Sequence, residues 1–87
     1  MQSPSSISVR CRLFARYAEI VGQDEVTLSL QRDATVAQAV AVLRQSVPDG
    51  ARLPEQPMVA VNQEHALAGQ VLADGDEIAL LPPLAGG

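Results

Sequence analysis

A single amphipathic helix, expected over residues 36–47, is the feature that most restricts how this chain can fold. The apolar stripe of this helix consists of Val36, Val40, Leu43 and Val47. Their spacings of four, three and four residues place them on one side of an α-helix. Thr35 precedes the stripe and Gln38 follows three residues later, which is the sequence of a capping box. Pro48 and the following Asp49-Gly50 end the helix, so one short helix has to cover the apolar surface of its neighbours.

The neighbouring segments have the pattern of β-strands. Residues 7–14 and 25–30 alternate between apolar and polar side chains, as half-buried strands do, and the two are expected to be antiparallel neighbours. Further strands are expected at 58–62 and, after an Asp74-Gly75 turn, at 77–81. The side chains predicted to point into the core are Ile7, Val9, Cys11, Leu13, Val26, Leu28 and Leu30. In the last expected strand, Ile78 and Leu80 share one face, and Ala79 and Leu81 share the other.

The order strand, strand, helix, strand, strand predicts an α+β fold in which a mixed sheet of four to five strands packs on one main helix. A short helical or irregular segment ended by Gly22 joins the first two strands. With 87 residues the chain has room for one domain. We assign a polar tail to residues 1–6, the domain to residues 7–81 and a flexible, extended tail to residues 82–87.

Composition and charge restrict the possible partners. The net charge of −4 argues against a nucleic-acid partner, because such binding requires Lys and Arg. Residues 1–52 hold all six arginines, whereas residues 53–87 hold five acidic residues and no Lys or Arg. This asymmetry fits either a basic partner or a solvated acidic surface. The sequence has neither a signal-peptide pattern nor an apolar run that could span a bilayer, so we expect a cytoplasmic protein.

Few side chains are candidates for catalysis or metal binding. Cys11 lies on the inward face of a predicted strand, where a thiol stays protonated and packs in the core. His65 has no second His or Cys at ligand spacing, so no metal site is predicted. Asp74, Asp76 and Glu77 could act as acids or bases, but their place at a turn and their contribution to solubility account for them without a catalytic role. The chain is therefore not expected to catalyse a reaction by itself.

The last eight residues, "LLPPLAGG", have an unusual composition. A polar, charged composition is typical of disordered tails, but this segment is apolar and uncharged. Pro82 and Pro83 favour an extended conformation, and Gly86 and Gly87 have no Cβ atom, so the backbone can enter a narrow channel. ATP could activate the terminal carboxylate as an acyl-adenylate, which a sulfur or nitrogen nucleophile then attacks. Gly87 is accordingly the predicted functional group.

Three stretches support a family resemblance: "RLFARYAEIVG" (12–22), "VAVNQE" (59–64) and "LADGDEIALLPPLAGG" (72–87). With these, the chain resembles the sulfur-carrier small subunits of molybdopterin synthase, which are ubiquitin-like β-grasp proteins. Thiamin sulfur carriers share the Asp-Gly-Asp turn and the Gly-Gly end. They are usually shorter, however, and lack the segment "LFARYAEIVG".

The resemblance implies a sulfur-transfer cycle in a heterotetramer. An adenylating enzyme activates Gly87 with ATP, a persulfide donor converts it to a thiocarboxylate, and the large synthase subunit uses the sulfur to build molybdopterin from cyclic pyranopterin monophosphate. Leu84, Ala85 and Gly86 complete the tail. The resemblance also implies docking through Phe14, Leu81 and the position of His65, where the family often has an apolar residue. It implies no stably bound cofactor, since the partner enzyme uses the ATP.

Three alternative functions remain open at the level of sequence. The chain could carry sulfur for thiamin or another thio-metabolite. It could be a ubiquitin-like modifier attached to lysines of other proteins, although without lysine it cannot form chains of itself. Finally, it could be a β-grasp binding module whose Gly-Gly end has no chemical role.

Overall fold

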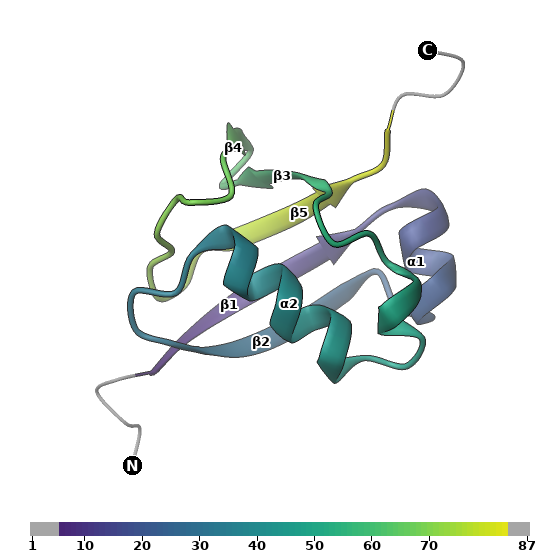
Figure 1. Ribbon diagram of the computed structural model, residues 1–87, viewed down its shortest axis with the longest axis horizontal. Coiled ribbons are helices and arrows are strands. Elements are labelled where there is room, and N and C mark those ends of the chain that lie inside the picture. Colours follow the sequence, from purple (N-terminus) through teal and green to yellow (C-terminus); the bar gives the residue numbers. More distant parts are fainter. Residues whose placement is uncertain (1–5, 84–87) are drawn as a thin grey trace.

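The computed structural model describes residues 6–83 and contains five strands, two α-helices and a short 3-10 helix. In chain order these are β1 (Ser6–Leu13), α1 (Ala15–Val21), β2 (Glu25–Gln31), α2 (Val36–Ser46), η1 (Gly50–Arg52), β3 (Met58–Val61), β4 (Glu64–Ala66) and β5 (Glu77–Leu81). The sheet lies behind α2, and α1 sits at the end of β1 (Figure 1). The β1 strand begins one residue before the expected start at Ile7.

The strands form one mixed sheet in the order β2-β1-β5-β3-β4. β1 runs parallel to β5 and antiparallel to β2, as predicted for the first two strands. β5, the last strand within residues 6–83, lies between β1 and the β3–β4 hairpin. This mixed sheet around one main helix is the β-grasp fold that the sequence predicted.

The core lies between α2 and the inner face of the sheet. Val36, Val40 and Leu43 of the predicted stripe are buried, and Leu43 has no exposed surface. Cys11 is also fully buried, together with Val9 and other inner-face residues of the sheet. The alternation read from the sequence therefore identified the buried face of each long strand correctly.

Both side chains of the predicted capping box make their hydrogen bonds. The Gln38 amide donates to Thr35 Oγ1 (3.3 Å), and the Thr35 amide donates to Gln38 Oε1 (2.8 Å). The amides of the first two helical residues donate to the carbonyls of Gln70 (2.9 Å) and Ala68 (3.0 Å). The loop after β4 thus completes the cap, so the amides at the N-terminus of α2 are already paired.

The β3–β4 hairpin has a turn that the sequence analysis did not predict. Asn62 and Gln63 both have positive φ, at 50° and 73°, which is the backbone of a type I′ turn. Asn is common at such positions, whereas Gln is not, so the turn gave no clear signal. The strand that follows, β4, has only three residues, too few for a detectable alternation.

We expect Leu43→Ala to lower the free energy of unfolding by about 2–5 kcal/mol, because it removes a fully buried side chain and leaves a cavity. Chemical denaturation of both proteins measures the difference. Leu67→Ala is the matched control, since the Leu67 side chain is 74% exposed. Equal midpoints for Leu43→Ala and the native chain would show that α2 is not the core helix.

Candidate functional site

Cys11, the one cysteine of the chain, is placed where it cannot serve as a nucleophile. Its side chain lies on the inner face of β1, opposite Val26 and Ile78 of the neighbouring strands. Burial raises the pKa of the Cys11 thiol to about 12, because the buried thiolate would lose its hydration. The thiol therefore stays protonated at neutral pH and contributes to packing.

The aspartates of the Asp74-Gly75-Asp76 turn hold segments of the fold together. Asp74 Oδ1 accepts from the Ser8 amide (2.7 Å), and the Gly75 amide donates to the Ser8 carbonyl (2.7 Å). Asp76 accepts from the Asn62 side chain (2.9 Å) and from the Ala73 amide (2.8 Å). The turn thereby connects the start of β1 with the β3–β4 hairpin, which agrees with a structural role for these carboxylates.

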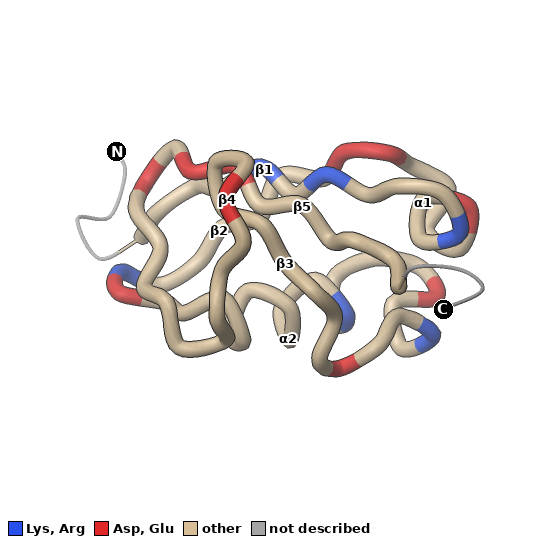
Figure 2. Tube along the Cα trace, turned by 90° about the horizontal axis from the view of Figure 1, so that it is seen from above, with Lys and Arg blue, Asp and Glu red and all other residues tan. Residues whose placement is uncertain are grey.

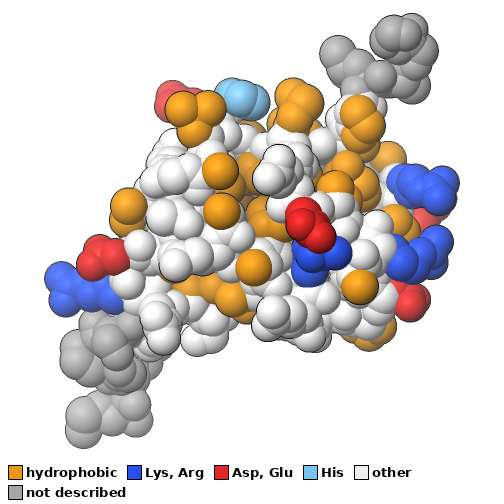
Figure 3. Space-filling model, in the orientation of Figure 1, with side chains coloured by type: hydrophobic (Ala, Val, Ile, Leu, Met, Phe, Trp, Pro, Cys, Tyr) orange, Lys and Arg blue, Asp and Glu red, His pale blue; other side chains and the backbone are white. Residues whose placement is uncertain are grey.

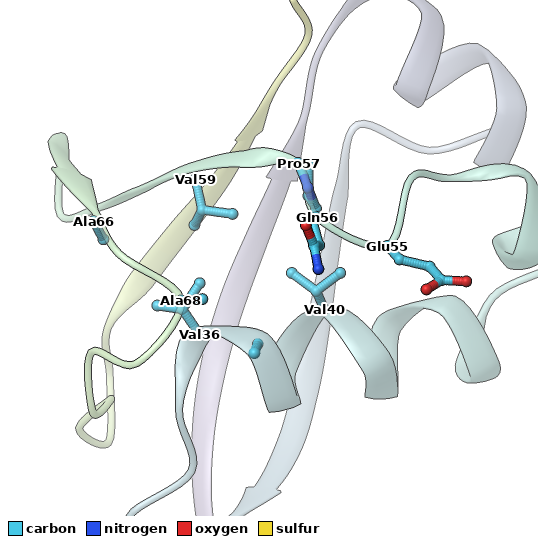
Figure 4. A pocket seen from close by; sticks show the side chains of 9 residues that line it. Val36, Val40, Glu55, Gln56, Pro57, Val59, Ala66 and Ala68 are labelled. Atoms are coloured by element: carbon cyan, nitrogen blue, oxygen red, sulfur yellow. The ribbon is translucent and has the colours of Figure 1, made fainter.

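The described part of the chain holds no cluster of three or more His, Cys, Asp or Glu side chains that could bind a metal ion. No helix within residues 6–83 is long and apolar enough to cross a bilayer. A cavity of about 370 Å³ lies between α2 and the β3–β4 hairpin, with Val36, Val40, Val59 and Ala66 among its lining residues (Figure 4). Its one ionisable lining residue is Glu55, so no catalytic group converges there.

The notable surface is an apolar area on the outer face of the sheet, opposite α2. Met58 pairs with Leu81, and Ala60 pairs with Ala79. These four side chains point away from the core, because Val59 and Leu80 next to them are buried. Phe14 follows β1 at the same end of the sheet. We call Phe14, Met58, Ala60, Ala79 and Leu81 the outer apolar patch.

Two members of the outer apolar patch are large and well exposed. Phe14 is 40% exposed and Met58 is 48% exposed, whereas Leu81 is half-buried. The Arg12 guanidinium carbon lies 5.6 Å from the centroid of the Phe14 ring, within the range of a cation–π contact. An exposed apolar area of this kind, bordered by a cation, is typical of a protein-binding surface.

The predicted docking residues share this side of the sheet. His65 is exposed on β4 and pairs with Ala60 of the outer apolar patch. Leu81 ends β5 and leads directly to Pro82. Phe14 and Leu81 thus lie next to the point where the tail begins, and His65 lies on the same face of the sheet, two strands away from β5. The other predicted site residues, Leu84, Ala85, Gly86 and Gly87, lie outside the described residues.

Sequence reasoning overlooked Met58 as a member of this surface. The signal was present, because the alternation in "MVAV" places Met58 and Ala60 on the face opposite the buried Val59 and Val61.

The elements near the outer apolar patch differ in the charges that they carry. Strands β4 and β5 each carry one Glu, and neither they nor β3 carry Lys or Arg, whereas β1, α1 and η1 carry arginines (Figure 2).

The chain is similar to known sulfur carriers and protein modifiers. The ThiS family model matches residues 11–87. The molybdopterin synthase sulfur carrier subunit of Homo sapiens is 36% identical over 77 residues, which cover 85% of this chain and 88% of the human protein. Small archaeal modifier protein 1 of Haloferax volcanii is 37% identical over 84 residues, 87% of this chain and 97% of that protein. Its crystal structure superposes with a TM-score of 0.81 at 34% identity, over 90% of this chain and 99% of that chain.

We expect the Cys11 thiol to react with iodoacetamide in the unfolded chain and to resist it in the native chain at neutral pH. The raised pKa also has a consequence for stability. The unfolded thiol ionises near its ordinary pKa of 9.0, whereas the folded thiol keeps its proton up to about 12. The contribution of Cys11 to stability is therefore complete below pH 9 and declines as the pH rises from 9 toward 12.

Denaturation curves of the native chain and Cys11→Ala between pH 8 and 11 measure this effect. The difference between their unfolding free energies should shrink as the pH rises. A constant difference, or fast alkylation of the native chain, would contradict a buried, protonated thiol.

Proposed function

The chain belongs to the ThiS family of ubiquitin-like sulfur carriers, and on that premise we propose that it is the sulfur-donating subunit of a molybdopterin synthase. A partner enzyme uses ATP to adenylate the Gly87 carboxylate and releases pyrophosphate. The terminal sulfur of a persulfide donor then displaces AMP and forms an acyl disulfide. A thiol reductant attacks the donor sulfur of this disulfide, which releases the thiocarboxylate and leaves the donor and the reductant joined as a disulfide. The large synthase subunit transfers this sulfur to cyclic pyranopterin monophosphate. The similarity to the human sulfur carrier subunit supports this assignment.

The observation that carries the proposal is the position of the outer apolar patch. It lies at the end of β5, directly before the tail, and Phe14 and Met58 expose much of their apolar surface there. A partner that covers this patch holds the body of the carrier while the tail enters its active site. In this proposal the partners supply the chemistry, and the adenylating enzyme binds the ATP.

A second candidate function is attachment to other proteins. It is favoured by the 37% identity to small archaeal modifier protein 1. The same adenylated Gly87 would then react with a lysine amine of a target and form an isopeptide bond. The two functions share activation and differ in the nucleophile that takes the acyl group, so isopeptide-linked products in extracts of the source cells distinguish them.

We expect Phe14→Asp to weaken binding to the cognate large subunit by about tenfold or more, because binding energy concentrates in a few apolar anchors. Leu81→Asp should act in the same direction. Titration calorimetry measures the affinity, and thermal unfolding verifies that each variant is folded. Leu67→Asp is the control, since Leu67 is exposed outside the outer apolar patch. Native affinity in both patch variants would refute docking through this surface.

Deletion of Gly87, or addition of one residue after it, should abolish sulfur loading without lowering the free energy of unfolding. Incubation with the cognate adenylating enzyme, ATP and a persulfide donor should change the intact mass by the difference between sulfur and oxygen. Fragment spectra should assign this change to Gly87. Cys11→Ala, if folded, should still be loaded. An unchanged native mass, or equal loading of the Gly87 deletion, would exclude the carrier function.

A further inference from the structure

The outer edge of β2 is a long strand edge without a partner in the described part of the chain. β2 lies at one end of the sheet and pairs only with β1. The Leu13 amide donates to the Asp24 carbonyl (2.9 Å), and bonding alternates along an antiparallel pair. Even-numbered residues of β2 therefore bond to β1. The amides and carbonyls of Glu25, Thr27 and Ser29 therefore point outward, as does the Gln31 amide, whereas the Gln31 carbonyl accepts from the Ala34 amide (3.1 Å).

This edge lacks the features that usually prevent strands from pairing. It has no proline, and Glu25 is its one charged residue. The opposite edge, β4, is protected by its length of three residues and by Glu64. The groove that lies between this edge and α2 is also free of charged side chains. A cavity of about 380 Å³ between β2 and α2 is lined by uncharged residues, including Ser29, Gln31, Gln38, Ala41, Val42 and Gln45.

Unpaired backbone groups along a straight edge are best satisfied by another extended strand. We propose that this strand is β2 of a second copy of the chain, paired antiparallel about a two-fold axis through Leu28. In this register Thr27 lies opposite Ser29, and Glu25 lies opposite Gln31. The outward-pointing groups therefore face one another, as a continuous antiparallel ladder requires.

Charge complementarity selects this register over its neighbours. It sets Asp24 of each copy opposite Arg32 of the other, at both ends of the ladder. Both side chains are exposed and have no ion pair in the described structure. If one copy of β2 is shifted along the other by two residues in one direction, Glu25 lies opposite Asp33, and two like charges meet. If it is shifted by two residues in the other direction, Arg32 lies opposite Gly22 and has no charged partner. The centred register alone provides two opposite-charge pairs.

The two-fold axis is perpendicular to the sheet, so the sheet continues through both copies and both α2 helices lie on one face. The grooves between β2 and α2 then join, and Gln38, Ala41 and Gln45 of the two helices face each other. Figure 3 shows mostly uncharged side chains on the α2 side of the molecule, with one acidic and one basic group side by side right of its centre and further charged groups at its two ends. The two tails leave from opposite ends of the joined sheet, and both outer apolar patches stay uncovered. Each copy therefore keeps its docking surface.

Sedimentation velocity of the purified full chain over a concentration series tests the proposal. We expect the mass to rise from 9.2 kDa toward twice that value as the concentration increases. Asp24→Arg alone and Arg32→Asp alone should each weaken the dimer by about tenfold or more, because each places like charges opposite one another. The double variant should restore it, since both pairs are re-formed with reversed charges. Glu64→Arg, on the other sheet edge, should have no effect.

Two further measurements separate loss of pairing from loss of folding. The Ser29 amide points outward, so Ser29→Pro removes no bond to β1 and should give a folded monomer by thermal unfolding. Amide exchange at Thr27 and Ser29 should slow with increasing concentration in the native chain. A native chain that stays monomeric up to its solubility limit would overturn the proposal. So would single charge reversals that leave the dimer intact, or a folded double variant that does not recover it.

Discussion

Burial of one stripe of α2 against the inner face of the sheet is the interaction on which the other parts of the structure depend. The core is almost entirely aliphatic, with Tyr17 as its one aromatic side chain, so close approach of helix and sheet has to supply most of the apolar contact. Both ends of α2 are tied to distant backbone. Carbonyls of the loop after β4 cap its start, and Arg44 near its end donates to the carbonyls of Leu53 (2.9 Å) and Ala51 (3.0 Å).

A close contact of backbone also fixes the turn after α2. Gly50 lies against the Arg44 carbonyl, where a Cβ atom would collide with the backbone. The sequence pair Asp49-Gly50 indicated a helix end, but it gave no sign of this contact. A pair of neighbouring residues such as Asp49-Gly50 can indicate where a helix ends. The contact that requires Gly at position 50 depends on how the turn packs against the helix, which the pair itself does not show.

The same distinction explains what the sequence could and could not predict. Thr35 and Gln38 are three residues apart, so their capping box could be recognised in the sequence. Alternation of apolar and polar side chains identified the buried faces of β1 and β2, and in β5 it grouped Ile78 with Leu80. The β4 strand depends on two positive φ values at Asn62 and Gln63 and had no comparable signal. At the site, Phe14, Leu81 and His65 were named from a family resemblance. The register that puts Met58 beside Leu81 required the sheet order.

The central position of β5 has a consequence for the timing of folding. β5 is synthesised after the other four described strands, yet it separates β1 from β3, and neither can complete its pairing without it. A nascent or truncated chain that lacks residues 77–81 therefore leaves two strands with open edges and an incomplete core. The strand that completes the sheet is continuous with the tail. Any chain that extends to Gly87 therefore also contains the strand that its fold requires.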